Sequence, residues 1–398
     1  MTDVIELARA LVRAPSANPP GDERAVADVV GDALSALGLP AATVLAALDH
    51  RPNLLVSLDF GAGGRHLVLS GHLDTKPIGD ATWSADPLGA ELDGDRLYGL
   101  GSADMKGALA AMLVAAGQCA AEPPARGRLS LLFTADEENG GAYGARHVAY
   151  TKPLRADGVV IGEPGGMETD FDRLHLVSRG IARLRLTATG RQGHSSLSAE
   201  PGTRNAGVDL ARLVTEVADR LRLPVPPNPD GLTGWTPTVN TALAFHGGVG
   251  YGVLPGRVGA DTEVRLLPGM TRQQVGDAFG ALVRAHARRT GAALAHEFDE
   301  PPNDWLPPAR VPAADPLALA AAHACHKVLG TAPPASVFPG TTDATFFQAA
   351  QGLPTLPALG PGLLRRAHAA DEWVSVEAVR RSVALYTELV REFCPGPA

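Results

Sequence analysis

Short apolar segments alternate with helix-like segments in the first half of the chain, and this alternation constrains the fold most. The apolar segments at residues 53–58, 66–73, 129–135 and 159–161 are bounded by polar residues or glycine, which is typical of buried strands. Residues 107–121 are rich in Ala and Leu and too long for a typical strand, so we expect a helix there. This order predicts an α/β sheet with helices on its faces.

The pattern changes after Gly180. Residues 181–187 alternate between apolar and polar side chains, as in a strand with one face in water. Periodicity then predicts, in chain order, a helix at 205–222, strands at 238–245 and 258–266, and a helix at 272–289. The order strand, helix, two strands, helix, strand is that of an α+β open-faced sandwich of the ferredoxin-like kind.

We therefore expect this second domain to be inserted into the first. The inserted domain is assigned to residues 179–292, which leaves residues 1–178 and 293–398 as the two parts of a mixed-sheet catalytic domain. The length of 398 residues also favours two domains over a single core.

Charge and cysteine usage exclude several classes of protein. A formal net charge of −8, without a concentrated basic stripe, argues against a nucleic-acid partner. The N-terminal residues carry acids where a signal peptide carries Lys or Arg, and no apolar run is long enough to span a membrane. Three scattered cysteines are too few for a disulfide framework. We expect a cytoplasmic protein that acts on a small molecule.

Acidic residues and histidines recur at the ends of predicted strands and the beginnings of predicted helices. Open α/β sheets gather their active sites at such positions, although each motif alone also has a structural explanation. The motifs are His72-Leu73-Asp74, Asp104 in a glycine-punctuated turn, Asp136-Glu137-Glu138, Glu163 after an apolar strand, and His368 ahead of the last helix. Nitrogen and oxygen ligands without a thiolate suit a hydrolytic zinc pair better than a structural zinc.

Together these motifs resemble the family of zinc hydrolases that includes acetylornithine deacetylase, succinyl-diaminopimelate desuccinylase, glutamate carboxypeptidase and aminoacylase. The resemblance covers nearly the whole chain. It rests on ordered motifs, namely Ser16-Ala17-Asn18-Pro19-Pro20-Gly21, Gly71-His72-Leu73-Asp74-Thr75, Gly101-Ser102-Ala103-Asp104-Met105-Lys106-Gly107, Asp136-Glu137-Glu138, Gly162-Glu163-Pro164, Gly340-Thr341-Thr342-Asp343-Ala344 and Ala367-His368.

The resemblance implies a two-metal site. Asp104 is expected to bridge two Zn²⁺ ions, for which Co²⁺ or Mn²⁺ could substitute, and a cis peptide often follows this aspartate in the family. Glu137 is expected to act as general base toward a metal-bridged hydroxide. Asp74 is expected to orient His72. The other ligands implied are His72 and Glu163 at one metal and Glu138 and His368 at the other.

The resemblance also implies residues that contact the substrate. His194 matches a position that stabilises the oxyanion from the partner subunit of a homodimer, and Arg265 matches an arginine that binds a substrate carboxylate. Thr342, in the Gly-Thr-Thr-Asp-Ala motif, is a further candidate for substrate binding. Gly252 stands where relatives commonly carry an asparagine, so we expect weaker selection for a free carboxylate unless Asn240, or else Tyr251, takes over that contact.

The function expected from these residues is hydrolysis of the amide bond of an N-acyl amino acid, as in a deacetylase or desuccinylase. A dipeptidase or carboxypeptidase of the same fold is the main alternative, because it would use the same metals and base and differ only in the acyl pocket. A non-catalytic metal-binding scaffold is a remote alternative, since such a protein would not need Glu137.

Overall fold

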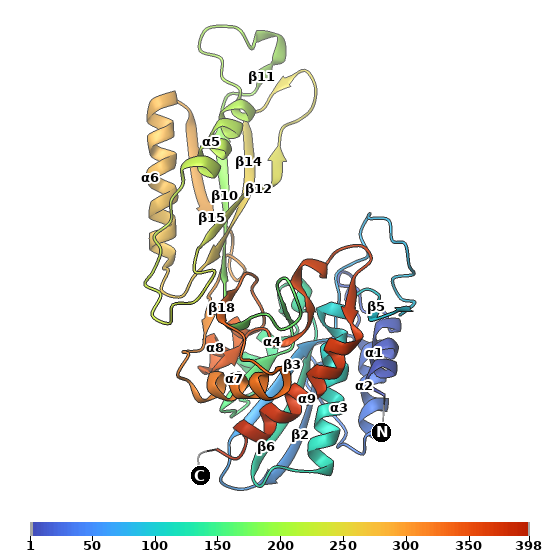
Figure 1. Cartoon of the computed structure of the whole chain (residues 1–398). Coiled ribbons are helices and arrows are strands. Elements are labelled where there is room, and N and C mark those ends of the chain that lie inside the picture. The colour runs from blue at the N-terminus through green and yellow to red at the C-terminus, as the bar shows by residue number, and fades with distance from the viewer. Residues whose placement is uncertain (1–2, 397–398) are drawn as a thin grey trace.

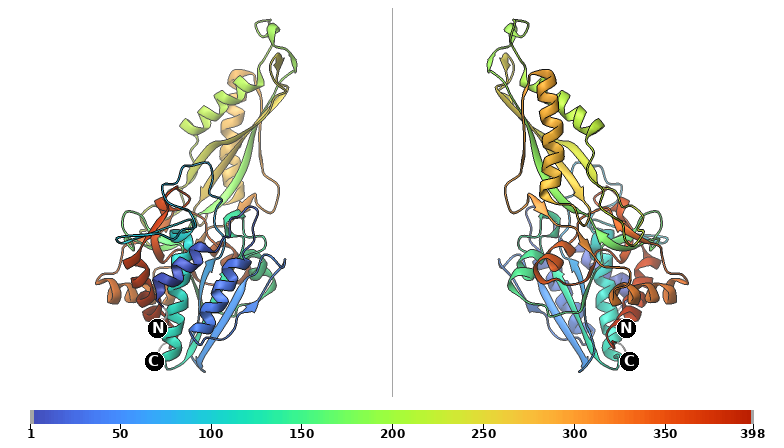
Figure 2. Two further views of the ribbon diagram at one scale, coloured as in Figure 1. Left: turned by 90° about the vertical axis from the view of Figure 1, so that its right-hand side faces the viewer. Right: turned by 90° about the vertical axis from the view of Figure 1, so that its left-hand side faces the viewer.

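The computed structural model describes residues 3–396 and shows two bodies (Figures 1 and 2). The larger body contains both the first and the last of the described residues, and the smaller body extends away from it in all the views. Among residues 3–396, no helix combines the length and the apolar character that crossing a bilayer requires.

The larger body is built on a six-stranded mixed sheet. Alternate residues of one central strand, β3 (His66–His72), pack into different apolar clusters. Leu67 and Leu69 pack in one apolar cluster, and Val68 packs in the other. Burial on both faces explains why these strands are continuous apolar runs. In spatial order the strands are β1 (Thr43–Val44), β2 (Leu54–Gly61), β6 (Gly127–Thr134), β3 (His66–His72), β7 (Gly158–Ile161) and β19 (Thr355–Leu356).

Helices cover both faces of this sheet, as the alternation predicted. The predicted helix at 107–121 is α3, and its Ala-rich surface lets α1 and α9 pack closely against it. Helices α4 and α8 contact each other and belong to the second cluster. The helices of this body are α1 (Val4–Arg13), α2 (Arg24–Ala36), α3 (Gly107–Ala121), α4 (Ala145–Thr151), α7 (Pro316–Leu329), α8 (Ala344–Gln351) and α9 (Val376–Phe393).

Short strands and helices complete the larger body around the edge of the sheet. Their pairings are β21-β5-β4, β17-β9-β18 and β20-β8. These strands are β4 (Leu92–Asp93), β5 (Arg96–Tyr98), β8 (Pro164–Gly166), β9 (Leu174–Ser178), β17 (Ala309–Arg310), β18 (Ala335–Phe338), β20 (Gly360–Leu363) and β21 (Trp373–Ser375). The short helical turns are η1 (Ser102–Lys106), η2 (Glu137–Asn139) and η4 (Leu364–Arg366).

The smaller body is the open-faced sandwich that the sequence predicted. Its antiparallel sheet has the order β12-β14-β10-β15, and α5 and α6 lie on one side of it (Figure 1). The elements are β10 (Gly180–Thr189), α5 (Ala206–Arg220), β12 (Thr238–Gly247), β14 (Arg257–Leu266), α6 (Arg272–Thr290) and β15 (Ala293–Phe298), followed by β16 (Trp305–Leu306), which also pairs with β10. At the far tip, β11 (Gly193–His194) pairs with β13 (Val253–Leu254), and η3 (Ser195–Leu197) follows β11.

The expected end of the inserted domain at residue 292 is too early. Strand β15 pairs with β10 from Thr189↔Ala293 to Leu184↔Phe298, so it belongs to the sheet of the smaller body. The physical reason is that β10 is a central strand, and its second edge needs the backbone hydrogen bonds that β15 supplies.

Candidate active site

Three neighbouring parallel strands bring the acidic and histidine motifs together. Strands β6, β3 and β7 are adjacent and parallel, so their carboxyl ends meet at one edge of the sheet. His72 ends β3, Glu137 and Glu138 follow β6, and Glu163 follows β7. Residues far apart in sequence therefore meet where a doubly covered sheet places its site.

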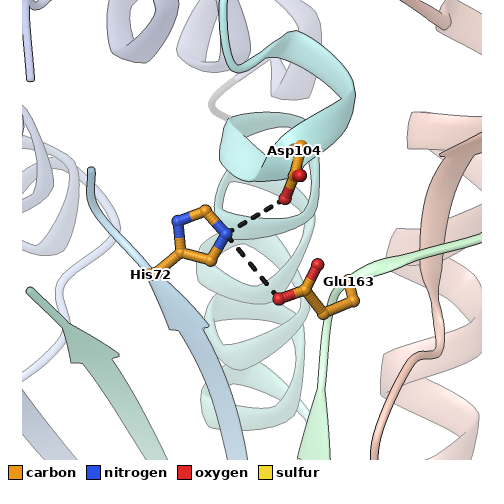
Figure 3. A group of neighbouring side chains, drawn as sticks. All are labelled: His72, Asp104 and Glu163. Carbon is orange, nitrogen blue, oxygen red and sulfur yellow. Dashed lines mark hydrogen bonds and ion pairs between the residues drawn. The ribbon is translucent and has the colours of Figure 1, made fainter. Parts of the chain in front are cut away.

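The first group of metal-ligating side chains consists of His72, Asp104 and Glu163 (Figure 3). His72 Nε2 lies 3.0 Å from Asp104 Oδ1 and 3.7 Å from Glu163 Oε1. All three residues are buried, and their ligand atoms lie within 4.8 Å of one another.

The second group consists of Asp104, Glu138 and His368. His368 Nε2 lies 3.2 Å from Asp104 Oδ2 and 3.1 Å from Glu138 Oε1. Asp104 therefore presents one carboxylate oxygen to each group, which is the placement expected of a bridging ligand. The peptide bond that follows it, between Asp104 and Met105, is cis.

The protonation behaviour of these groups shows that the cluster lacks positive charge. Burial opposes protonation of His368, yet hydrogen bonds to Asp104 and Glu138 raise the pKa of His368 to about 10. In the same way, contacts with Asp104 and the neighbouring acids hold the pKa of buried His72 well above its usual value. Burial and neighbouring carboxylates raise the pKa of Glu163 well above its usual value. Divalent cations would supply positive charge to this carboxylate-rich cluster, so the donor set fits two metal ions.

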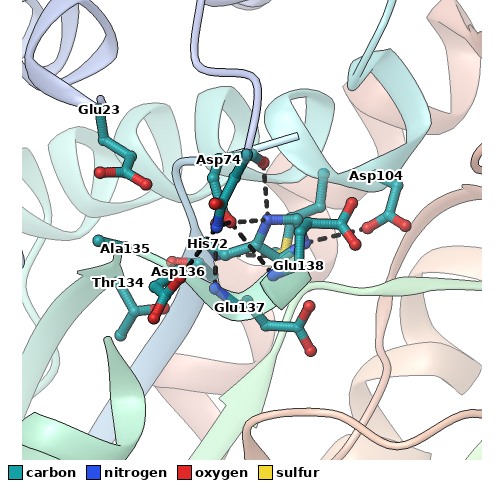
Figure 4. Close-up of polar contacts among 12 residues, drawn as sticks. Glu23, His72, Asp74, Asp104, Thr134, Ala135, Asp136, Glu137 and Glu138 are labelled. Carbon is teal, nitrogen blue, oxygen red and sulfur yellow. Dashed lines mark hydrogen bonds and ion pairs between the residues drawn. The ribbon is translucent and has the colours of Figure 1, made fainter. Parts of the chain in front are cut away.

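Asp74 orients the site through its main chain and its side chain separately. His72 Nδ1 lies 2.9 Å from the main-chain oxygen of Asp74 but 3.6 Å from its carboxylate. The carboxylate instead accepts hydrogen bonds from the main-chain N–H groups of Glu137, at 3.2 Å, and Glu138, at 3.1 Å (Figure 4). The expected link between Asp74 and His72 thus runs through the carbonyl, and the carboxylate fixes the acidic turn.

Asp136 is the structural member of the acidic triplet. Its backbone is left-handed (φ 62°), and its side chain points away from Glu137 and Glu138 (Figure 4). Its carboxylate lies 2.8 Å from Arg51 Nη2, and Arg51 also contacts the buried Glu23 at 2.8 Å. Buried Arg51 thus offsets part of the repulsion among the acids of this turn.

Glu137 is half-buried and lines the wall of the cavity. Burial raises the pKa of Glu137 well above its usual value, although His72 acts in the opposite direction. A carboxyl group with a raised pKa beside a substrate cavity is suited to accept and return a proton.

Glu372 is a positioning residue that the sequence motifs do not reveal. Its buried carboxylate accepts hydrogen bonds from the N–H groups of Gly101 (3.0 Å), Ala103 (2.9 Å) and Asp104 (3.0 Å). Burial raises the pKa of Glu372 to about 8. This side chain holds the turn that carries Asp104. In the sequence, the only signal is an acid four residues after His368, and this position does not reveal the partners of its carboxylate.

The cavity, of about 580 Å³, lies between the two bodies. Glu137, His368, Arg265 and Thr342 line it, so two of the expected substrate-binding residues reach the site. Asn240 does not line it, because its side chain is exposed on the edge strand β12. The expectation that Asn240 takes over carboxylate binding therefore has no support within one chain.

His194 also lies outside the cavity. It belongs to β11 at the tip of the smaller body, far from the larger body (Figure 1). There Ser195 N–H donates to Gly252 O at 2.9 Å, so His194 and Gly252 share the tip. Within one chain, neither residue can act on a substrate bound at Glu137.

Two ligand groups that share a carboxylate, with a glutamate beside them at a cavity, are the arrangement of a metal-dependent hydrolase. The chain belongs to peptidase family M20/M25/M40, whose family model matches residues 68–392. It is 30% identical to a succinyl-diaminopimelate desuccinylase from Methylocella silvestris, over 98% of this chain and 97% of that protein. It is 32% identical to an acetylornithine deacetylase from Klebsiella pneumoniae, over 87% of this chain and 84% of that protein.

A solved structure has the same fold. An M20 family metallo-carboxypeptidase from Sulfolobus solfataricus superimposes with a TM-score of 0.75 at 20% identity, over 99% of both chains.

Proposed function

We propose that this hydrolase cleaves the amide bond of an N-acyl amino acid, as a deacetylase or desuccinylase does, with Zn²⁺ at both metal positions. The observation that carries the proposal is Asp104, whose two oxygens face His72 and His368 while Glu137 lines the adjoining cavity. The names of the two relatives support the substrate class. Imidazole and carboxylate ligands without a thiolate support zinc, with Co²⁺ or Mn²⁺ as substitutes.

The side chains of the site divide the work. His72 and Glu163 would bind one ion, and Glu138 and His368 would bind the other. Asp104 would bind both ions. When bound, the ions supply Lewis acidity and lower the pKa of water toward ~7. Glu137 accepts the proton of the attacking water and returns it to the leaving amine.

We further propose that the chain works as a homodimer. The motivation is that His194 and Gly252 lie at the tip, where they cannot reach their own cavity. Exposed apolar side chains on and near the edge strand β12, namely Leu243, Phe245, Val249 and Tyr251, offer a surface that a second copy could cover. The partner's tip would then bring an imidazole to the oxyanion.

A dipeptidase or carboxypeptidase is the second candidate, and Arg265 in the cavity favours it as much as it favours a deacylase. A hydrolysis screen of the zinc-loaded protein separates the two. It compares N-acetyl, N-succinyl and N-formyl amino acids with dipeptides. The deacylase proposal predicts a higher kcat/KM for an N-acyl amino acid than for every dipeptide, and the reverse order would overturn it.

A further inference from the structure

Arg183 is a cavity arginine whose guanidinium has no protein partner among the described residues. It is half-buried in β10 and lines the same cavity as Glu137. Within residues 3–396, its guanidinium forms no ion pair and no side-chain hydrogen bond, in contrast to Lys76 and Arg265 in the same cavity. Lys76 Nζ lies 3.3 Å from Glu138 Oε2, and Arg265 Nε lies 2.8 Å from Glu263 Oε1. The donors of Arg183 are thus free for a ligand.

The strand register places Arg183 next to the expected carboxylate-binding arginine. On the face of the sheet away from α5 and α6, Ile181 stands opposite Arg265 and Arg183 stands opposite Glu263. Arg183 is therefore two residues farther from the larger body than Arg265, a spacing of about 7 Å along the strands. Glu263, its direct neighbour, is already neutralised by Arg265.

The next arginine on this face provides a contrast. Arg185 stands opposite Asp261, and the two form an ion pair with 2.8 Å between Nε and Oδ1. Arg185 does not line the cavity that contains Glu137. Arg185 is thus paired outside the cavity, whereas Arg183 lines the cavity without an ion-pair partner among residues 3–396.

We propose that Arg183 is a specificity-determining residue that binds a second carboxylate of the substrate. This inference rests on the proposed function. A carboxylate matches two N–H groups of a guanidinium, and its charge would complement the free charge of Arg183. The substrate class is then an N-acyl amino acid with two carboxylates, spaced about 7 Å apart if Arg265 holds the first. The second carboxylate belongs either to the acyl group or to the amino-acid side chain.

The proposal is tested with pairs of substrates that differ only in the second carboxylate. The zinc-loaded protein is used in the oligomeric state in which it is purified. One arm compares N-succinyl-L-alanine with the same compound carrying a terminal carboxamide, and the other compares N-acetyl-L-glutamate with N-acetyl-L-glutamine. The ratio of kcat/KM within each pair is measured for the wild type, Arg183→Gln, Arg183→Lys and the control Arg185→Gln. Calorimetric binding of succinate and glutarate to metal-free protein provides a readout that does not depend on turnover.

The wild type should prefer the second carboxylate in one arm, and that arm identifies which part of the substrate carries it. Arg183→Gln should reduce that preference by about 10- to 100-fold, the range for a lost hydrogen bond to a charged group. Arg183→Lys should retain part of the preference, and Arg185→Gln should retain all of it.

Hydrolysis of N-acyl amino acids without such a preference, or an equal preference in Arg183→Gln, would overturn the inference and leave the proposed function intact. If no N-acyl amino acid is hydrolysed, the proposed function fails. Dicarboxylate binding equal in wild type and Arg183→Gln would then overturn the role of Arg183 separately.

Discussion

Replacing Glu372 by glutamine should weaken metal binding although Glu372 is not expected to touch a metal. Its Oε1 accepts the N–H groups of Ala103 and Asp104, and its Oε2 accepts that of Gly101. A glutamine has a single carbonyl oxygen, so its NH₂ group must face at least one of these N–H donors. At least one hydrogen bond to a charged acceptor is lost, which is worth about 1.5 to 3 kcal/mol.

The lost hydrogen bond should weaken metal binding because it helps to fix the backbone of Asp104, the residue expected to bind both metals. Residues that orient a metal ligand typically change metal affinity by about 10- to 100-fold when replaced, and we expect a change of that size for Glu372→Gln. Competition for zinc against a chromogenic chelator measures it. Glu377→Gln is the matched control on the nearby helix α9, because the side chain of Glu377 is exposed and pairs with Arg381 at the surface. Zinc affinity in Glu372→Gln equal to that of the control would refute this reasoning.

Three further predictions address other parts of the molecule. Mixing Glu137→Gln with His194→Ala protein should restore part of the activity that each lacks, because a hybrid dimer contains one intact site; no recovery from a stable mixed dimer would contradict the dimer proposal. Asp74→Ala should lower both metal content and kcat, because the N–H groups of Glu137 and Glu138 lose their acceptor; unchanged values for both would contradict that role. Burial lowers the pKa of His175 from 6.5 to about 4, so the unfolded chain takes up the proton first and stability falls as pH falls through this range, by about 3 kcal/mol. Urea unfolding should show a flatter profile for His175→Gln, and an identical profile would contradict the assignment.

The main sheet and the meeting of the candidate metal ligands could be predicted from the sequence because their signals are local. A continuous apolar strand that ends in a histidine or is followed directly by an acid, as at His72 and Glu163, predicts both a buried strand and a candidate ligand within a few residues. The resemblance to the family assigned each candidate ligand to one of the two groups, and Asp104 does face both histidines.

The remaining features depend on contacts that no local pattern encodes. Glu372 accepts a hydrogen bond from the N–H of Asp104, which is 268 residues away in the sequence. Among the described residues, the guanidinium of Arg183 is left without an ion pair because its cross-strand neighbour Glu263 pairs with Arg265. The end of the inserted domain was misplaced because β15 is a short strand whose partner, β10, lies about a hundred residues earlier. The position of His194 at the tip separates it from its own cavity, which a matched sequence position could not show.

Metal content and turnover of Glu137→Gln, measured on the same preparation, test the central claim most directly. Glu137 lines the cavity but belongs to neither ligand group, so the variant should retain two metal ions per chain. Its kcat on an N-acyl amino acid should fall by at least about 10²- to 10⁴-fold, the usual contribution of a general base. Loss of metal, or turnover close to that of the wild type with both metals bound, would contradict the account.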